Sequence, residues 1–133
     1  MESLKKSILA VDDTPASLKI IHGALSGEFS LHLAKSGGMA MSTLENTTVD
    51  LILLDIEMPG ISGFDIIDLL KKKPNLKDIP VIFVTSHATS DFVVEAAKRG
   101  AKDYLAKPYT PDLLRDKVHK ALETEASAAR GSM

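Results

Sequence analysis

Residues 49–60 read VDLILLDIEMPG, in which a single carboxylate, Asp55, interrupts an apolar run that extends from Leu51 to Ile56. Such a run predicts a strand that is buried on both faces, and Met58-Pro59-Gly60 ends it. Aspartate is depleted from strand interiors and is seldom buried without a partner. We therefore expect Asp55 at the C-terminal end of the strand, facing a polar site. For one aspartate considered alone, a carboxylate that merely caps the following loop is the better explanation.

The composition is that of an ordinary soluble domain. The chain has 133 residues, a formal net charge of −2 and no cysteine. The length suits one domain with a substantial core, and the small net charge gives no strong field to attract nucleic acid or an anionic membrane. Without cysteine there is no disulfide framework, thiol nucleophile or cysteine-based metal site. The N-terminal residues predict neither a signal peptide nor a membrane span, and we expect a cytoplasmic protein.

Strand and helix patterns alternate five times along the chain. Thr14-Pro15 and Thr110-Pro111 each supply an N-cap residue followed by proline at the first helical position, and Gly100 suits the left-handed position that ends a helix. This alternation predicts an α/β fold with a parallel sheet covered by helices on both faces. We expect strands at residues 7–11, 29–33, 51–54, 81–86 and 104–106, and helices at about residues 15–25, 39–44, 64–70, 90–99 and 111–122.

Two further segments need an interpretation. The basic run at residues 71–73 ends a helical pattern, where cations suit the helix dipole, so we interpret it as a solvated helix end. Ser36-Gly37-Gly38 is expected to form a turn. One domain is predicted over residues 1–125, with residues 126–133 as a C-terminal tail or the start of a linker. The alanine-rich residues 126–130 could extend the last helix into a signalling linker.

The unusual polar residues gather at one place in this scheme. Asp12 and Asp13 follow the first strand, Asp55 ends the third, Thr85 ends the fourth and Lys107 follows the fifth. The carboxyl ends of parallel strands share one edge of the sheet, where open α/β folds bind ligands. Each residue has a simple structural explanation by itself, such as helix capping for the first pair. Together they indicate a functional site.

The residue types in this set indicate a particular chemistry. Three neighbouring carboxylates repel one another and need a cation, and Mg²⁺ is the natural choice for a site built only from oxygen ligands. A carboxylate beside Mg²⁺, with an ammonium and a hydroxyl close by, suits phosphoryl transfer. The carboxylate attacks phosphorus while the metal and the lysine neutralise the equatorial oxygens.

At this point the sequence resembles a known family, the receiver domain of two-component response regulators. The resemblance covers residues 8–122, and each motif is weak alone but specific in this order and spacing. The motifs are Val11-Asp12-Asp13, Asp55-Ile56-Glu57-Met58-Pro59-Gly60 with Gly63, Val84-Thr85-Ser86, and Lys107-Pro108. The resemblance implies a flavodoxin-like sheet of five parallel strands in the order 2-1-3-4-5.

The resemblance also implies a role for each residue at this edge. Asp55 would accept a phosphoryl group from a phosphohistidine. Asp13 would bind Mg²⁺ directly, Asp12 would act largely through water, and Asp55 with the backbone carbonyl of Glu57 would complete the protein ligands. Lys107 would contact the phosphoryl oxygens. The domain would be a phosphoacceptor that assists its own phosphorylation and dephosphorylation, not an enzyme acting on a separate substrate.

Four residues would govern switching and kinetics. On activation the Thr85 hydroxyl would bind a phosphoryl oxygen and Tyr104 would move inward behind it, although an aromatic residue is common in any strand. Glu57 and His87 lie two residues beyond the acceptor and two beyond the threonine. Both would flank the path of an attacking water, and we hypothesise that the pair sets the lifetime of the phosphorylated state. A protonated His87 could pair with Glu57.

The implied partners are proteins. A histidine kinase or a histidine phosphotransfer protein would donate the phosphoryl group, and a downstream protein or a fused effector domain would respond. By family analogy, partner or homodimer contacts are expected around residues 92–99, Tyr104 and residues 115–120, which belong to the fourth helix, fifth strand and fifth helix. No direct contact with nucleic acid or membrane is expected.

Other functions fit the residues less well. A hydrolase of the haloacid dehalogenase type would place its nucleophile after the first strand with a second acid two residues later, whereas Asp12 and Asp13 are adjacent. A flavin or dinucleotide binder would have glycines or hydroxyls there to bind phosphate. A phosphorylation-independent pseudo-receiver would lack one of the acids or the lysine, and this chain lacks none.

Overall fold

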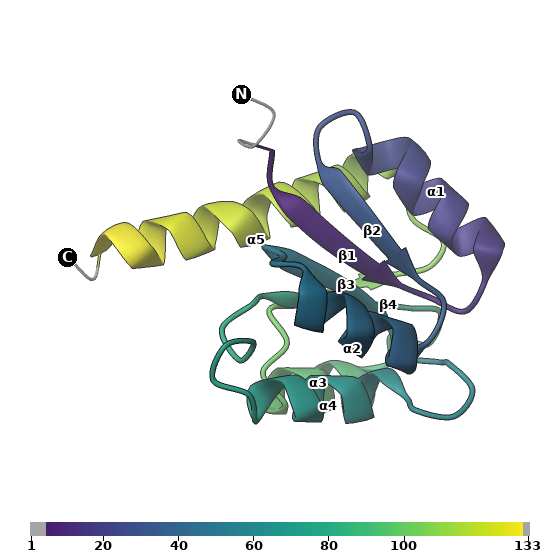
Figure 1. Ribbon diagram of the computed structural model, residues 1–133. Helices are drawn as coiled ribbons and strands as arrows, with labels where there is room; N and C mark the ends of the chain where they lie inside the picture. Colours follow the sequence, from purple (N-terminus) through teal and green to yellow (C-terminus); the bar gives the residue numbers. More distant parts are fainter. Residues whose placement is uncertain (1–4, 132–133) are drawn as a thin grey trace.

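The computed structural model describes residues 5–131, and for residues 124–131 it describes the backbone alone. Strands and helices alternate five times, as predicted (Figure 1). Within the described residues, no helix is long and apolar enough to cross a membrane. The elements are β1 (Ser7–Val11), α1 (Pro15–Leu25), β2 (Ser30–Ala34), α2 (Gly37–Asn46), β3 (Leu51–Asp55), α3 (Gly63–Lys71), β4 (Val81–Thr85), α4 (Ser90–Lys98), β5 (Asp103–Ala106) and α5 (Pro111–Gly131).

The five strands form one parallel sheet in the order β2-β1-β3-β4-β5, which confirms the predicted topology. Helices α1 and α5 cover one face, and α2, α3 and α4 cover the other (Figure 1). Two of the three inner strands, β3 and β4, are buried at every position, which is why their sequences are apolar runs without alternation. Asp55 is the last residue of β3, so the polar residue enters only where the strand ends.

The second strand and second helix differ from prediction. Strand β2 covers Ser30–Ala34, one residue later than expected, and its Leu33 side chain is 38% exposed in a groove between the start of α1 and the end of β2. The expected turn at Gly37 and Gly38 is instead the first turn of α2. Ser36 caps this helix by accepting a hydrogen bond from the backbone N–H of Met39 at 3.2 Å. Gly37 is buried, and a Cβ there would lie 3.2 Å from Ile66 of α3.

An aromatic cluster connects α3, β4 and α4. The rings of Phe64, Phe83 and Phe92 contact one another, with centroids 5.4 to 5.8 Å apart. The guanidinium of Arg99 lies 4.6 Å from the Phe64 ring centroid and also contacts Asp68 of α3. Phe83 is a core residue, and the partly buried Phe64 and Phe92 pack against it. These contacts attach α4 to the layer beside β3.

The last helix is longer than its buried face requires. Leu114, Val118 and Ala121 pack against the sheet, and the helical backbone continues to Gly131. Residues 126–130 therefore extend the last helix, as the sequence suggested. In Figure 1 this end of α5 projects beyond the edge of the sheet. Whether the extension is a linker stays a prediction.

Gly63 allows α3 to begin directly against the end of β3. A Cβ at this position would lie 2.7 Å from the backbone oxygen of Asp55 and 2.8 Å from the Cα of Ile56, both too short for real contacts. The backbone N–H of Gly63 donates to the carbonyl of Ile56 at 3.2 Å. Ser62 and Asp65 form a reciprocal capping box at the same helix start. The loop that carries Asp55 therefore depends on a residue without a side chain.

Replacing Gly63 with alanine should destabilise the domain by about 1 to 3 kcal/mol, because the backbone around Asp55 would have to move. Urea unfolding would measure the change. Gly23→Ala is the matched control, since no atom lies within 4 Å of the position that its Cβ would take. That substitution lies within α1 and should be neutral or stabilising by up to about 1 kcal/mol. Equal losses in both variants would contradict this explanation.

Candidate functional site

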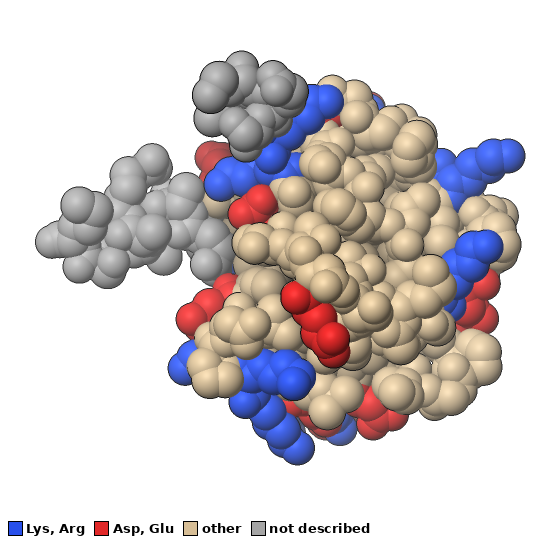
Figure 2. Space-filling model, viewed as in Figure 1, with Lys and Arg blue, Asp and Glu red and all other residues tan. Residues whose placement is uncertain are grey.

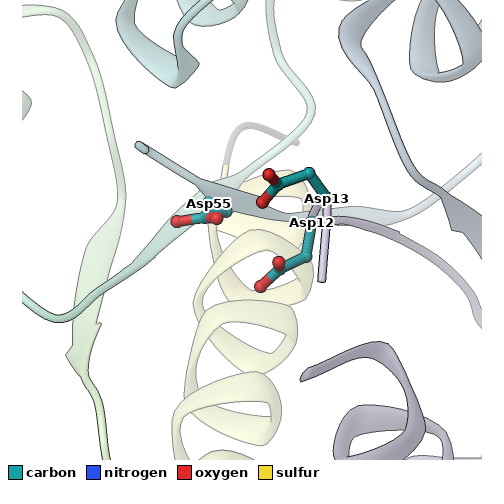
Figure 3. A group of neighbouring side chains, drawn as sticks. All are labelled: Asp12, Asp13 and Asp55. Carbon is teal, nitrogen blue, oxygen red and sulfur yellow. The ribbon is translucent and has the colours of Figure 1, made fainter. Parts of the chain in front are cut away.

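Three carboxylates meet at the carboxyl edge of the sheet. Asp12 and Asp13 follow β1, and Asp55 ends the neighbouring strand β3 (Figure 3). Each offers an oxygen within 4.8 Å of the other two. Asp12 and Asp55 are buried, with 1% and 5% of their surface exposed, whereas Asp13 is exposed. The parallel topology therefore brings together the acids that the sequence analysis selected, and it leaves one side of the cluster open to solvent.

Lys107 joins this cluster through Asp12. Its ammonium donates to Oδ2 of Asp12 at 2.9 Å and to the hydroxyl of Ser17 at 3.3 Å. The other oxygen of Asp12 accepts a hydrogen bond from the backbone N–H of Thr14 at 2.9 Å. Asp12 thus both stabilises the start of α1 and neutralises the lysine. The peptide bond between Lys107 and Pro108 is cis.

Asp55 is buried beside the charge of Asp12. Burial raises the pKa of Asp55 to about 6. A hydrogen bond from the backbone N–H of Glu57 at 3.2 Å opposes this rise, and the charge of Asp12 adds to it. A raised pKa means that the local surroundings disfavour the negative charge. A cation bound among the three carboxylates would remove this penalty.

Glu57 lies across the end of β4. Its Oε1 accepts hydrogen bonds from the hydroxyls of Thr85 at 3.2 Å and Ser86 at 3.0 Å, and from the backbone N–H of Ser86 at 3.4 Å. Its Oε2 lies 2.6 Å from Nδ1 of His87. The Glu57–His87 pair considered from the sequence therefore exists in the structure, although the His87 side chain is 71% exposed.

These contacts favour an ionised Glu57. Partial burial alone would raise its pKa, but the hydrogen bonds from Ser86 and the nearby His87 outweigh burial and lower the pKa of Glu57 below its ordinary value. The Thr85 side chain is fully buried and lies between its two partners. Its hydroxyl donates to Glu57 and accepts from the backbone N–H of His87 at 3.0 Å.

Tyr104 lies on β5 beside β4 and is half-buried. The strand register pairs it with Phe83 and pairs Ala106 with Thr85, so Tyr104 and Thr85 point to the same face of the sheet. Its ring packs against the core beneath α3 and α4 and lies 5.1 Å from the ammonium of Lys117. Tyr104 is therefore placed behind Thr85, away from the acidic cluster.

The donor set fits a small divalent cation. All three side chains supply carboxylate oxygens, which are the ligands that Mg²⁺ prefers. They converge from two neighbouring strand ends, and exposed Asp13 leaves space for water. The raised pKa of Asp55 agrees with a site whose charge a bound cation would balance.

Two partners in this region were not predicted. Ser86 stood in a motif but had no role assigned, and it donates two hydrogen bonds to Glu57. Ser17 lies in the first turn of α1 and contacts Lys107. The position of Ser86 directly after Thr85 could have indicated its role from the sequence. No pattern distinguishes Ser17 from any other serine on a helix.

The fold and this edge together define a flavodoxin-like α/β protein with an acidic cluster at the carboxyl end of its sheet. The sequence pattern of the response regulator receiver domain matches residues 8–119. The chain belongs to this family, whose members serve two-component signalling, and the resemblance inferred from the motifs is confirmed.

Known relatives include both short and long proteins. A probable cyclic di-GMP phosphodiesterase of Vibrio cholerae is 36% identical over 96% of this chain, which spans only 29% of that protein. The chemotaxis protein CheY of Pseudomonas aeruginosa is 34% identical over 87% of this chain and 95% of its own length. A solved CheY-like receiver domain protein of Methanospirillum hungatei has a TM-score of 0.86 and 28% identity, covering 93% of this chain and 98% of its own.

Because the pKa of Asp55 is raised, Asp55→Asn should stabilise the metal-free protein by an amount that depends on pH. At pH 8 the ionised carboxylate destabilises the folded state, so the neutral amide should stabilise it by on the order of 2 kcal/mol. This gain should shrink as pH falls through about 6, where folded Asp55 takes up its proton, and should vanish near the ordinary aspartate pKa of about 4.

Thermal unfolding with a chelator present, for both proteins across this pH range, would measure the difference. Mg²⁺ is the control, because at pH 8 it should stabilise the unsubstituted protein more than the variant. If the stabilisation by Asp55→Asn did not change with pH, this would contradict the conclusion that the surroundings of Asp55 disfavour its negative charge.

Proposed function

We propose that this domain is a phosphorylation-activated switch of a two-component phosphorelay, with Asp55 as the phosphoryl acceptor. The observation that carries the proposal is the position of Asp55 at the end of buried β3, within 4.8 Å of two further carboxylates. The donor is a histidine kinase or a histidine phosphotransfer protein. Family membership supports this class of donor.

In the proposed transfer, a carboxylate oxygen of Asp55 attacks the phosphorus of a phosphohistidine. A P–O bond forms, the P–N bond breaks, and the imidazole leaves with the electron pair and takes up a proton. Asp12, Asp13, Asp55 and the backbone carbonyl of Glu57 would hold Mg²⁺, which would supply positive charge for the phosphoryl oxygens. Lys107, now paired with Asp12, follows β5 at the same edge and supplies a second positive charge.

Switching then depends on Thr85. Its hydroxyl donates to Glu57 in this structure, so it must leave that carboxylate before it donates to a phosphoryl oxygen. Tyr104 lies on the same face of the sheet, where it can move inward as Thr85 moves. The resulting change in the face formed by α4, β5 and α5 would be recognised by a partner or by a second copy.

The target is a downstream protein or a fused effector domain. The relatives support both arrangements, since this chain spans nearly all of one CheY and less than a third of the Vibrio cholerae phosphodiesterase. We place the domain in the cytoplasm, where kinases of this type present their phosphohistidine. It acts as a phosphoacceptor that assists its own chemistry, and its output needs no direct contact with nucleic acid or membrane.

Incubation with Mg²⁺ and acetyl phosphate should add one phosphoryl group to the protein, detected by intact mass. Asp55→Asn and a chelator should each abolish the gain, because the first removes the nucleophile and the second removes the cation. If the small donor is refused, a phosphorylated histidine kinase replaces it. Failure with both donors would overturn the proposal.

The Glu57–His87 pair should control the lifetime of the phosphorylated state. The pair lies two residues beyond Asp55 and two beyond Thr85, where it would flank the path of an attacking water, and its carboxylate would disfavour a water that is becoming hydroxide-like. Combining Glu57→Asn with His87→Ala should therefore speed dephosphorylation about three- to tenfold, measured as loss of the phosphorylated mass with time.

A matched control lies far from the site. His119 and Glu28 form a similar exposed pair, with 3.0 Å between Nε2 and Oε1. Glu28→Asn combined with His119→Ala should leave the lifetime unchanged. An unchanged lifetime in the Glu57 and His87 variant, or an equal effect in the control, would rule out the kinetic role.

A further inference from the structure

A second surface feature lies outside the phosphorylation site. A cavity of about 590 Å³ opens between the start of α1, the end of β2 and the start of α2. Leu18 forms its deepest part as a core residue, and Leu33 and Met39 form its walls. The volume is within the range of ligand-binding sites in proteins, about 300 to 1,000 Å³. The residues that the proposed phosphorylation uses do not line it.

The groove carries apolar surface that the fold leaves exposed. Leu33 is 38% and Met39 is 49% exposed, although both are large apolar side chains that gain from burial. Between residues 29 and 48, which form β2 and α2, only Lys35 and Glu45 are charged. Figure 2 shows that the surface over β2 and α2 is largely uncharged. A contiguous apolar surface of this kind indicates an interaction site.

The rim of the groove has one sign of charge. Lys19, His22 and Lys35 are its ionisable lining residues, and no carboxylate lines it. None of the three has a carboxylate partner within the described part of the chain, whereas Arg99, Arg115 and Lys117 beside other helices each have one. Unpaired cations around an apolar floor are complementary to a ligand that is apolar in the middle and negative at its edges.

This groove is separate from the pocket next to Lys107. That smaller pocket, of about 340 Å³, uses Ser17, Ile20 and Tyr109, whereas the larger groove uses Lys19 and His22 on another side of α1. A ligand in the groove would therefore leave the pocket beside Lys107 free.

We propose that the α1–β2 groove binds an acidic amphipathic helix of a partner protein. The groove is open to solvent along one side, so a helix can place its apolar face on Leu33 and Met39 while its other face stays in water. Glutamate or aspartate flanking that apolar face would pair with Lys19 and Lys35. The proposal does not depend on phosphorylation of Asp55.

Two helical peptides test the recognition directly. Both carry leucine at positions i, i+3, i+4 and i+7, with glutamate on the flanks in one and lysine in the other. Fluorescence anisotropy of the labelled peptides measures affinity, and the amide NMR signals of Leu33 and Met39 report where they bind. The glutamate peptide should bind at least about tenfold more tightly than the lysine peptide.

Charge reversal makes the test specific to the groove. Combining Lys19→Glu with Lys35→Glu should invert the preference, so that the lysine peptide now binds more tightly. Combining Lys72→Glu with Lys77→Glu makes the same change in net charge at exposed lysines outside the groove. This control should keep the original preference.

Several results would overturn the proposal. Failure of the glutamate peptide to bind, or equal binding of both peptides, would remove the charge complementarity. If the control variant lost the preference for the glutamate peptide to the same extent, the preference would come from the overall charge of the protein and not from the groove. Self-association that sedimentation detects and Leu33→Asp abolishes would make the occupant a second copy of this chain. Binding of laurate in place of the glutamate peptide would make the groove a site for small amphipathic anions.

Discussion

The structure is organised by the repulsion among three carboxylates that a parallel sheet forces together. Because β1 and β3 are neighbours and point the same way, the acids that follow them must share one edge. Lys107 balances Asp12, but Asp55 stays buried with a charge that its surroundings disfavour. The close start of α3, which only a glycine permits, holds Asp55 in this position. The rigid core therefore keeps the unfavourable charge of Asp55 at the carboxyl edge of the sheet.

Sequence reasoning predicted the sheet order, the strand ends and the acids well because those features follow from strong patterns. β3 and β4 are continuous apolar runs, and connection rules then leave few topologies. It failed where burial depends on a neighbour far away in the chain. Leu33 belongs to an alternating apolar pattern, but it lies in the groove beside α1. Gly37 was expected in a turn, but it begins a helix that Ser36 caps. The hydrogen bonds of Ser17 and Ser86 depend on rotamers that no residue spacing encodes.

Helix α4 is the least firmly held element on its face of the sheet. Ala96 is its one buried residue, and its attachment to the layer beneath relies on the ring of Phe92 and the contacts of Arg99 with α3. Few buried contacts imply a low free energy for local opening. A helix held in this way can change position without disturbing β3 or β4, where every residue is buried.

A hydroxyl group has one proton to donate, and in this structure Thr85 donates it to Glu57. While that bond lasts, no other oxygen at the edge can receive the same proton. A new anion at this edge would compete with Glu57 for that proton, because a proton shared between two acceptors binds each less strongly than a direct hydrogen bond would. Exclusive donation of this kind favours two discrete arrangements over a continuum of intermediate ones. Under the function proposed above, Thr85 would therefore act as a contact with two positions.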